Sequence, residues 1–272
     1  APAWGESFRL VTLRQRHSDI VQVVDGRWRG VRREPDGAVK LTGDALITTE
    51  PGLLLAVQVA DCLPILLVDP VRRVVAAVHA GWRGTLARIV EKTVGRMQMR
   101  FGSEPRRLVA AIGPGIHGCC YEVGREVYER YVAQFAEGEA LFRCVEPAPS
   151  DPEPSGHWHP KVIGRPLKPL AAKAAVAPAC PESRKPARAG IRDRGASRRW
   201  SSTGGSTGAA TRWFLDLVEA NRRQLRSAGL RAGNITAVGL CTACRTDLFF
   251  SHRAEAGRTG RQMALIGIGW RT

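Results

Sequence analysis

Short apolar runs alternate with amphipathic stretches along most of this chain, and the two patterns predict different elements. The runs are rich in Val, Ile and Leu and are bounded by polar or turn-forming residues, which is typical of buried strands. Apolar residues three or four positions apart are typical of helices with one buried face. Strands are predicted at residues 20–24, 53–60, 65–69, 74–78, 107–112, 235–240 and 263–269, and helices at residues 85–101, 125–135 and 214–228. This alternation predicts an α/β fold.

Residues 155–212, here named the basic segment, depart from this pattern. They are rich in Ala, Pro, Arg, Ser and Gly and show no sustained strand or helix periodicity. Such a composition buries too little apolar surface to offset the entropy that is lost on ordering. We therefore predict one domain, formed by residues 1–154 and 213–272 and interrupted by a disordered insertion at 155–212. A shifted reading frame also produces this composition, and a basic tether for an acidic partner is the functional alternative.

Charge and cysteine content narrow the class of protein. The 272-residue chain is 44% hydrophobic and has a formal charge of +16, of which the basic segment supplies +10 through 12 Lys and Arg against 2 Asp and Glu. The folded part is therefore not expected to bind nucleic acid. No apolar run approaches the roughly 18 residues of a membrane span, and no secretory signal precedes the first strand, so we expect a cytoplasmic protein that contacts no membrane. The seven cysteines are expected to be thiols, ligands or core residues rather than a disulfide framework.

Three residues with metal-binding side chains lie near the ends of predicted strands. Cys62 follows residues 53–60, His79 follows residues 74–78, and His17 precedes residues 20–24. If they converge, two imidazoles and a thiolate give a metal ion three ligands and leave one coordination position open, which is the arrangement of a catalytic site. In the alternative, Cys62 is a small buried residue, His79 a core histidine and His17 a surface histidine.

The neighbours of these candidates fit the same chemistry. Pro64 is expected to hold Cys62 in a turn, and Asp61 can accept a hydrogen bond from a ligand histidine and so fix its tautomer. Arg83 stands at the start of the helix predicted over residues 85–101, where free N–H groups and a guanidinium favour phosphate. A surface arginine is the alternative for Arg83.

A glycine-rich stretch at residues 113–118 matches the pattern G-x-G-x-x-G. A dinucleotide-binding fingerprint should open a helix, whereas strand-like or turn-like residues come next here. We therefore reject a dinucleotide site and predict a loop that presents Cys120, Tyr121 and Glu122.

Two motifs near the C-terminal end are less specific. Cys241 and Cys244 form a C-x-x-C pair, and a zinc ribbon needs a second such pair, so we predict two thiols in a loop. Residues 249–253 place two phenylalanines beside His252 and Arg253. These side chains can stack on a base or simply close the core.

Together, the motifs resemble one protein family. The most specific pair is A-D-C-L-P at residues 60–64 and V-H-A-G-W-R-G at residues 78–84. Further stretches occur in the same order: G-D-A-L-I-T at 43–48, G-P-G-I at 113–116, C-Y-E-V at 120–123, D-L at 216–217, C-T at 241–242 and F-F-S at 249–251. Over residues 14–146 and 214–270 the chain resembles the laccase-domain family, also called the polyphenol oxidase or purine nucleoside phosphorylase family, which includes a peptidoglycan-editing factor.

The resemblance implies a mixed β-sheet sandwich flanked by helices, and zinc bound by the residues that match the family's ligands, His17, Cys62 and His79. It also implies phosphorolysis of adenosine, inosine and methylthioadenosine, and deamination of adenosine. Older descriptions of the family name copper-dependent phenol oxidation, so copper is the alternative metal. Purine nucleosides and phosphate are the implied partners.

On this matched frame, the remaining candidates fall around the substrate. Arg83 is expected to hold phosphate, and Asp44 or Glu122 to bind ribose hydroxyls or move protons. Cys120, Tyr121 and Arg253 complete the predicted substrate-binding residues.

Two departures from the family pattern leave different functions open. The residues before His17 lack the Arg-x-Gly-Gly-Val-Ser and Ser-Leu-Asn-Leu motifs that family members usually carry, and the basic segment stands where the family has a short connection. We therefore expect weakened phosphate binding, with an inactive fragment as the extreme case. The chain could instead be a cysteine hydrolase or amidase that acts on a cell-wall precursor, with Cys62 as nucleophile and His79 as base, or a non-catalytic protein that binds through the basic segment.

Overall fold

The computed structural model describes residues 8–25, 33–34, 37–38, 41–145 and 211–269. Contacts divide the chain into one unit of Ala1–Cys144 and Trp213–Thr272 and a second of Val145–Arg212. The disordered insertion predicted at residues 155–212 lies, up to residue 210, outside the described residues. The first unit contains nearly all of the described residues.

A mixed six-stranded sheet forms the centre of this unit, in the order β15-β11-β9-β10-β7-β3. Its inner strands are antiparallel neighbours, whereas β15 and β3 pair parallel to β11 and β7 at the two edges. Every residue of β10 is buried, because both faces of the sheet are covered. The strands are β3 (Val21–Val24), β7 (Ala45–Thr48), β9 (Leu63–Asp69), β10 (Val74–Ala80), β11 (Val109–Ile112) and β15 (Ile235–Ala237).

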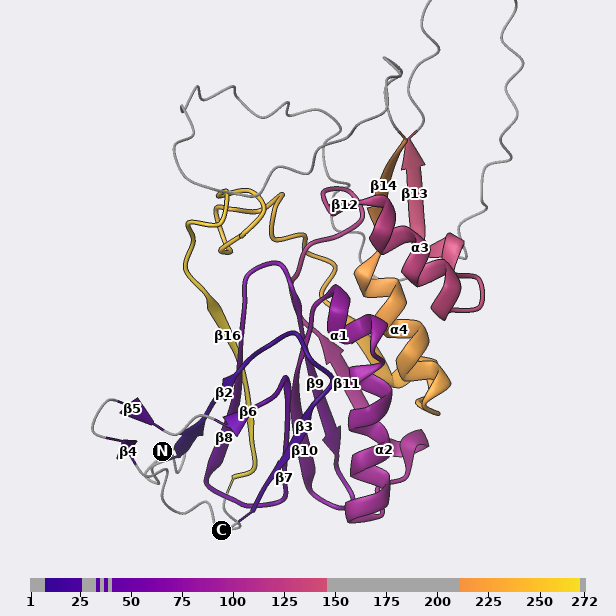
Figure 1. Cartoon of the computed structure of the whole chain (residues 1–272). Coiled ribbons are helices and arrows are strands. Elements are labelled where there is room, and N and C mark those ends of the chain that lie inside the picture. The colour runs from indigo at the N-terminus through magenta and orange to yellow at the C-terminus, as the bar shows by residue number, and fades with distance from the viewer. Residues whose placement is uncertain (1–7, 26–32, 35–36, 39–40, 146–210, 270–272) are drawn as a thin grey trace, which may run out of the picture. The chain divides into compact units, whose positions relative to one another are not determined.

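A second sheet covers one face of the central sheet. It consists of β1 (Arg9–Val11), β8 (Leu53–Val59) and β16 (Gln262–Gly267), in the order β1-β8-β16. Leu46, Val75 and Ala77 of the central sheet share a core with Leu55 and Val57 of β8. The two sheets therefore form a sandwich, with helices on the opposite face of the central sheet (Figure 1). This confirms the predicted fold class.

Four α-helices are present in the described residues: α1 (Trp82–Leu86), α2 (Ile89–Phe101), α3 (Arg125–Gln134) and α4 (Leu217–Ser227). The single helix predicted over residues 85–101 is wrong. The chain turns at Arg88, whose φ of 62° lies in the left-handed region, and this turn separates α1 from α2. Arg83 consequently lies in a helix of five residues rather than at the start of a long one.

Other predicted boundaries also move, and the strands predicted over residues 107–112 and 235–240 are shortened to β11 and β15. The helix predicted from residue 214 begins at Leu217, because Arg212–Leu215 form strand β14 and Asp216 caps the helix by accepting from the Glu219 N–H. Pro64 lies inside β9 rather than in a turn. It pairs in register with His79 of β10, so it still helps to place Cys62 opposite His79.

The remaining elements are short. They are β2 (Leu13–Arg14) with β6 (Leu41–Thr42), β4 (Arg33–Glu34) with β5 (Gly37–Ala38), a small sheet of β12 (Glu122–Val123), β14 and β13 (Phe142–Val145), and 3-10 turns at Pro105–Arg107, Gly138–Leu141 and Ala232–Asn234. No helix in the described ranges combines the length and the apolar character needed to cross a bilayer.

Candidate metal centre

Three side chains from separate segments meet at one end of the central sheet. Cys62 lies in the turn between β8 and β9, His79 lies near the end of β10, and His17 lies in the bend between β2 and β3. One candidate ligand atom from each lies within 4.8 Å of the other two. The rings of His17 and His79 are 4.9 Å apart, edge to face. The structure therefore brings together all three residues that the sequence put forward as metal ligands.

The donor set fits a zinc ion. With bonds of about 2.3 Å to sulfur and about 2.05 Å to nitrogen, tetrahedral geometry separates a sulfur from a nitrogen donor by about 3.6 Å. His17 Nε2 lies 3.8 Å from Cys62 Sγ. Small side-chain adjustments are enough for these atoms to share one ion, and three protein ligands leave the fourth position for a reactant.

Asp44 orients both histidines of this centre. Its fully buried carboxylate accepts a hydrogen bond from His79 Nδ1 at 2.8 Å, which leaves Nε2 of that ring for a metal. The same carboxylate accepts the backbone N–H groups of Arg16, His17 and Ser18 and the Ser18 hydroxyl. These bonds hold His17 at a left-handed φ of 57°. Contacts of this kind suit a residue that positions ligands better than one that touches ribose.

The prediction that Asp61 accepts a hydrogen bond from a ligand histidine is wrong, because Asp61 bonds to other groups. Its φ is 81°, and its carboxylate accepts from the hydroxyls of Thr242 at 2.6 Å and Ser251 at 2.7 Å and from the backbone N–H of Arg253 at 2.6 Å. Asp61 therefore ties the turn that carries Cys62 to the segment of residues 242–253.

The ligands also shift one another's proton affinities. Burial disfavours the Cys62 thiolate, but hydrogen bonds from His17 and His79 outweigh burial and lower the pKa of Cys62 to about 6. Burial likewise disfavours protonated His79, but hydrogen bonds to Asp44 and Cys62 raise its pKa to about 9. Despite its burial, Asp44 has a pKa well below the usual range, because His79 and Ser18 donate to it. A thiolate is thus available near neutral pH, as metal binding requires.

Gly81 leaves room for the ligands. A Cβ atom at this position would lie 2.8 Å from Cys62 Sγ and 3.0 Å from His17 Cδ2. A residue without a side chain is needed at position 81, because two ligand side chains pack directly on its backbone.

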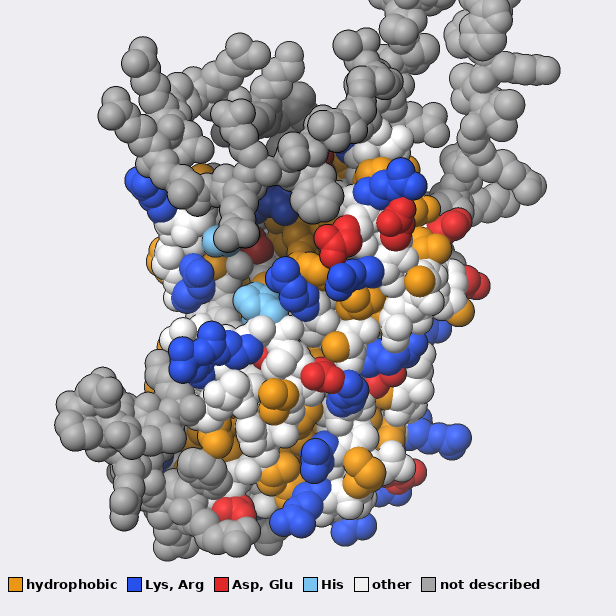
Figure 2. Space-filling model, viewed as in Figure 1, with side chains coloured by type: hydrophobic (Ala, Val, Ile, Leu, Met, Phe, Trp, Pro, Cys, Tyr) orange, Lys and Arg blue, Asp and Glu red, His pale blue; other side chains and the backbone are white. Residues whose placement is uncertain are grey.

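A basic cavity of about 590 Å³ opens beside His17. Arg83 lies on its wall with the guanidinium 4.4 Å above the Trp82 ring, and Lys and Arg side chains gather beside a histidine on this face (Figure 2). The other basic residues of the wall are Arg88, Lys92 and Arg130. Arg83 is exposed, so it can bind an anion at the cavity mouth.

Three other predicted substrate residues, Tyr121, Glu122 and Arg253, lie together outside this cavity. Arg253 donates to the backbone oxygen of Glu122 at 2.9 Å, and its guanidinium lies 5.4 Å from the Tyr121 ring centre. Burial raises the pKa of Tyr121, and the nearby charge of Cys62 raises it further. Tyr121, Glu122 and Arg253 thus form a group on the Cys62 side of the centre. They are not part of the cavity wall.

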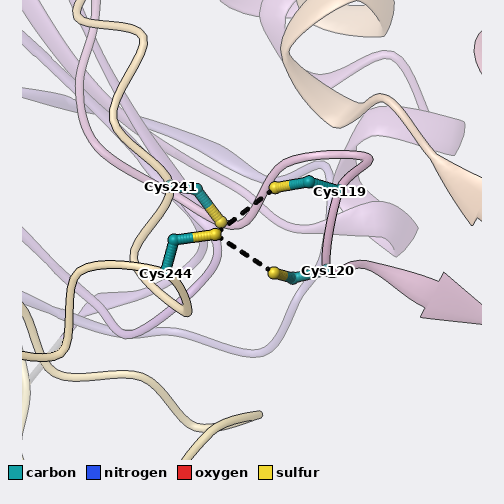
Figure 3. A group of neighbouring side chains, drawn as sticks. All are labelled: Cys119, Cys120, Cys241 and Cys244. Atoms are coloured by element: carbon teal, nitrogen blue, oxygen red, sulfur yellow. Dashed lines mark hydrogen bonds between the residues drawn. The ribbon is translucent and has the colours of Figure 1, made fainter. Parts of the chain in front are cut away.

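Cys120, also predicted to bind substrate, lies in a separate group of four cysteines. It lies with Cys119, Cys241 and Cys244, and the four sulfur atoms are within 4.8 Å of one another (Figure 3). The sequence prediction of two isolated loop thiols at Cys241 and Cys244 missed this group. The adjacent pair Cys119-Cys120 was the available signal, because it supplies the second pair of thiols that a four-sulfur site requires.

The model of one protein family, described as "Multi-copper polyphenol oxidoreductase laccase", matches residues 3–163 and 169–269. The chain belongs to this family. Membership confirms the resemblance carried by the A-D-C-L-P and V-H-A-G-W-R-G motifs.

Relatives of this laccase family member have enzyme names. A purine nucleoside phosphorylase of Deinococcus radiodurans is 34% identical over 83% of this chain, which spans 61% of that protein. The purine nucleoside phosphorylase YlmD of Geobacillus stearothermophilus is 34% identical over 95% of this chain and 72% of its own length. Adenosine deaminase RL5, from an unknown prokaryotic organism, is 44% identical over 93% of this chain and 72% of its own length.

Solved structures agree with the fold. The crystal structure of YlmD from Geobacillus stearothermophilus superimposes with a TM-score of 0.65 and 32% identity, covering 96% of this chain and 74% of that one. A Bacillus licheniformis protein, YfiH, gives a TM-score of 0.66 at 30% identity, with 95% of this chain and 74% of that chain covered.

Proposed function

We propose that this chain is a zinc-dependent purine nucleoside phosphorylase that also deaminates adenosine. The observation that carries the proposal is the convergence of His17, Cys62 and His79 on one point, with a fourth position left open. The names of the relatives support a nucleoside-processing enzyme, since two of them are purine nucleoside phosphorylases and one is an adenosine deaminase.

Zinc bound by these ligands would supply Lewis-acid catalysis and activate water for attack on a purine amino carbon. The chain's own residues bind and position. Asp44 keeps His79 in the tautomer whose Nε2 faces the centre. The protonated phenol of Tyr121, whose pKa is raised, can donate a hydrogen bond to a purine acceptor close to Cys62.

Phosphorolysis also needs an anion held beside the sugar. Arg83 meets this need, because it is exposed on the cavity wall and His17, a ligand of the proposed centre, lines the same cavity. The other basic residues of the wall pair with carboxylates: Arg88 with Glu91, Lys92 with Asp19 and Arg130 with Glu126. Phosphate bound there would lie next to the metal centre, and the guanidinium offers it paired donors.

The test is phosphate-dependent release of hypoxanthine from inosine by the zinc-loaded chain, together with ammonia release from adenosine. Cys62→Ala should abolish both reactions, because it removes the thiolate ligand. Cys144→Ala is the matched control, since Cys144 is an exposed thiol outside both thiol-containing clusters. Turnover that survives in Cys62→Ala, or that does not depend on metal, contradicts the proposal.

A cysteine hydrolase is the second candidate, and one observation favours it. Cys62 has a pKa of about 6 and His79 a pKa of about 9, so the metal-free site holds a thiolate beside an imidazolium, as activated cysteine nucleophiles do. Chelation separates the two candidates. A hydrolase keeps its amidase activity without metal and loses it on thiol alkylation, whereas the phosphorylase stops on chelation.

Copper is the alternative metal, because two imidazoles and one thiolate are also donors that copper accepts. The chain has 6 histidines in all, and among the described residues two of them lie at this centre. A multi-copper site binds several ions through many imidazoles, so two histidines are too few for one here. Elemental analysis of the purified chain decides between one zinc and one copper at this centre.

A further inference from the structure

Four thiols from two distant segments meet on the side of the metal centre that carries Tyr121. Cys119 and Cys120 come from the loop before β12, and Cys241 and Cys244 from the loop after β15. Cys244 Sγ lies 3.3 Å from Cys120 Sγ and 3.6 Å from Cys119 Sγ, and the sulfur atoms point toward a common centre (Figure 3). The mechanism proposed above does not use these four residues.

The spacing of the sulfur atoms fits a tetrahedral metal site. Four sulfurs at about 2.3 Å from a zinc ion lie about 3.8 Å from one another. The separations of 3.3 Å and 3.6 Å, and the upper bound of 4.8 Å for the whole set, bracket this value. A disulfide requires about 2.05 Å between sulfurs, so none of these four residues is disulfide-bonded in this structure.

Three of the four thiols are shielded from solvent. Cys241 is buried, Cys120 and Cys244 are partly buried, and Cys119 is exposed at the outer edge. Neutral thiols pack together as small apolar groups, but more than one thiolate among four sulfur atoms this close would be disfavoured by repulsion between like charges. A shared cation removes that repulsion.

We propose that Cys119, Cys120, Cys241 and Cys244 bind a second zinc ion with a structural role. Four thiolates fill the coordination shell and leave no position for a reactant, which distinguishes this site from the three-ligand centre. Binding would release the remaining thiol protons and would join two loops that lie far apart along the chain. The proposal does not depend on the proposed enzymatic function.

The contacts around the four cysteines show what this zinc ion would hold in place. Thr242, next to Cys241, donates its N–H to Gly115 at 3.0 Å and its hydroxyl to Asp61 at 2.6 Å. Asp61 precedes Cys62, and Tyr121 follows Cys120. A metal ion in the four-cysteine site would therefore fix both the turn that carries Cys62 and the loop that carries Tyr121.

The test is the zinc content of the full chain, purified without chelators. We expect two zinc ions per wild-type chain, one in Cys62→Ala and one in the double variant Cys119→Ser/Cys244→Ser. Cys144→Ser, which alters an exposed thiol outside the group, should keep both. One zinc ion in the wild type that persists in the double variant overturns the proposal, as does disulfide linkage of the four cysteines in the purified protein.

A second measurement covers the case in which the double variant does not fold. X-ray absorption at the zinc edge, recorded on Cys62→Ala, reports only the remaining ion. We expect four sulfur neighbours at about 2.3 Å and no nitrogen neighbour. A shell that contains nitrogen or oxygen, or a Cys62→Ala protein that holds no zinc, contradicts the four-cysteine site whether or not the enzyme proposal survives.

Discussion

Replacing Asp44 by Asn tests how the metal centre is held together. The carboxylate accepts from His79 Nδ1 and His17 N through Oδ1 and from Ser18 N and Oγ through Oδ2. In Asp44→Asn one oxygen becomes an NH₂ group, which cannot accept. Whichever way the amide faces, at least one buried or partly buried N–H loses its acceptor, at a cost of about 1–3 kcal/mol. The metal-free protein should be destabilised by at least that amount.

The effect on metal binding depends on the same contacts. Loss of the group that orients a ligand histidine lowers metal affinity by about 10–100-fold, or about 1.4–2.7 kcal/mol. Zinc affinity measured by competition with a chromophoric chelator, on a chain whose four-cysteine site is filled or removed, gives this factor directly. We expect Asp44→Asn to bind zinc about 10–100-fold more weakly than the wild type at the three-ligand centre.

Asp69→Asn is the matched control. Asp69 is 1% exposed and lies in the same sheet, but its Oδ1 accepts the N–H groups of Val71 and Arg72 and binds no metal ligand in the described residues. Its Oδ2 has no hydrogen-bond partner in the described part of the chain, so an NH₂ group can take that place. Its zinc affinity should equal that of the wild type. If Asp44→Asn also binds zinc like the wild type, the orienting role assigned to Asp44 is refuted.

Three other changes test neighbouring parts of the account. Gly81→Ala should weaken zinc binding at least about 10-fold, because a Cβ 2.8 Å from Cys62 Sγ displaces this ligand by more than the roughly 0.2 Å that zinc geometry tolerates. Gly95→Ala is the control and should leave zinc affinity unchanged, because a Cβ there has nothing within 4 Å. In metal-free protein, alkylation of Cys62 followed by peptide mass spectrometry should show a midpoint at pH about 6, since the thiolate persists above that pH, and a midpoint near the roughly 8.5 of a free thiol refutes the hydrogen bonding described. Arg83→Ala should raise the KM for phosphate by about 10–100-fold with little change in kcat, because a charge-assisted hydrogen bond contributes about 1.5–3 kcal/mol; an unchanged KM removes Arg83 from the phosphate site.

The parts of the fold that could be predicted from the sequence are those fixed by burial. Strands β9 and β10 are runs of apolar residues because both faces of the central sheet are covered. Strand β8 is apolar because the second sheet, to which it belongs, packs on the central sheet. The break at Arg88 left no such signal. The apolar period continues across it, because Leu86 of α1 and Ile89 of α2 pack in the same core on either side of Arg88.

Part of the candidate site could likewise be predicted from the sequence, and part could not. Cys62 and His79 could be named because they stand in specific motifs, and His17 because of its place before a predicted strand and the family resemblance. The strand termini next to the three residues meet at one end of the central sheet. That Asp44 rather than Asp61 orients His79 could not be predicted, since both aspartates lie within a few residues of a strand end and only the tertiary register decides which one faces His79. The four-cysteine group was missed because its two halves, Cys119-Cys120 and Cys241-Thr242-Ala243-Cys244, differ in spacing and meet only in the folded chain.

Anomalous scattering at the zinc edge, measured on crystals of the zinc-loaded chain, tests the central claim most directly. We expect a peak within about 2.0–2.3 Å of His17 Nε2, Cys62 Sγ and His79 Nε2. A density map with no peak between these three side chains, in protein that has full access to zinc, contradicts the metal centre on which the proposed chemistry depends.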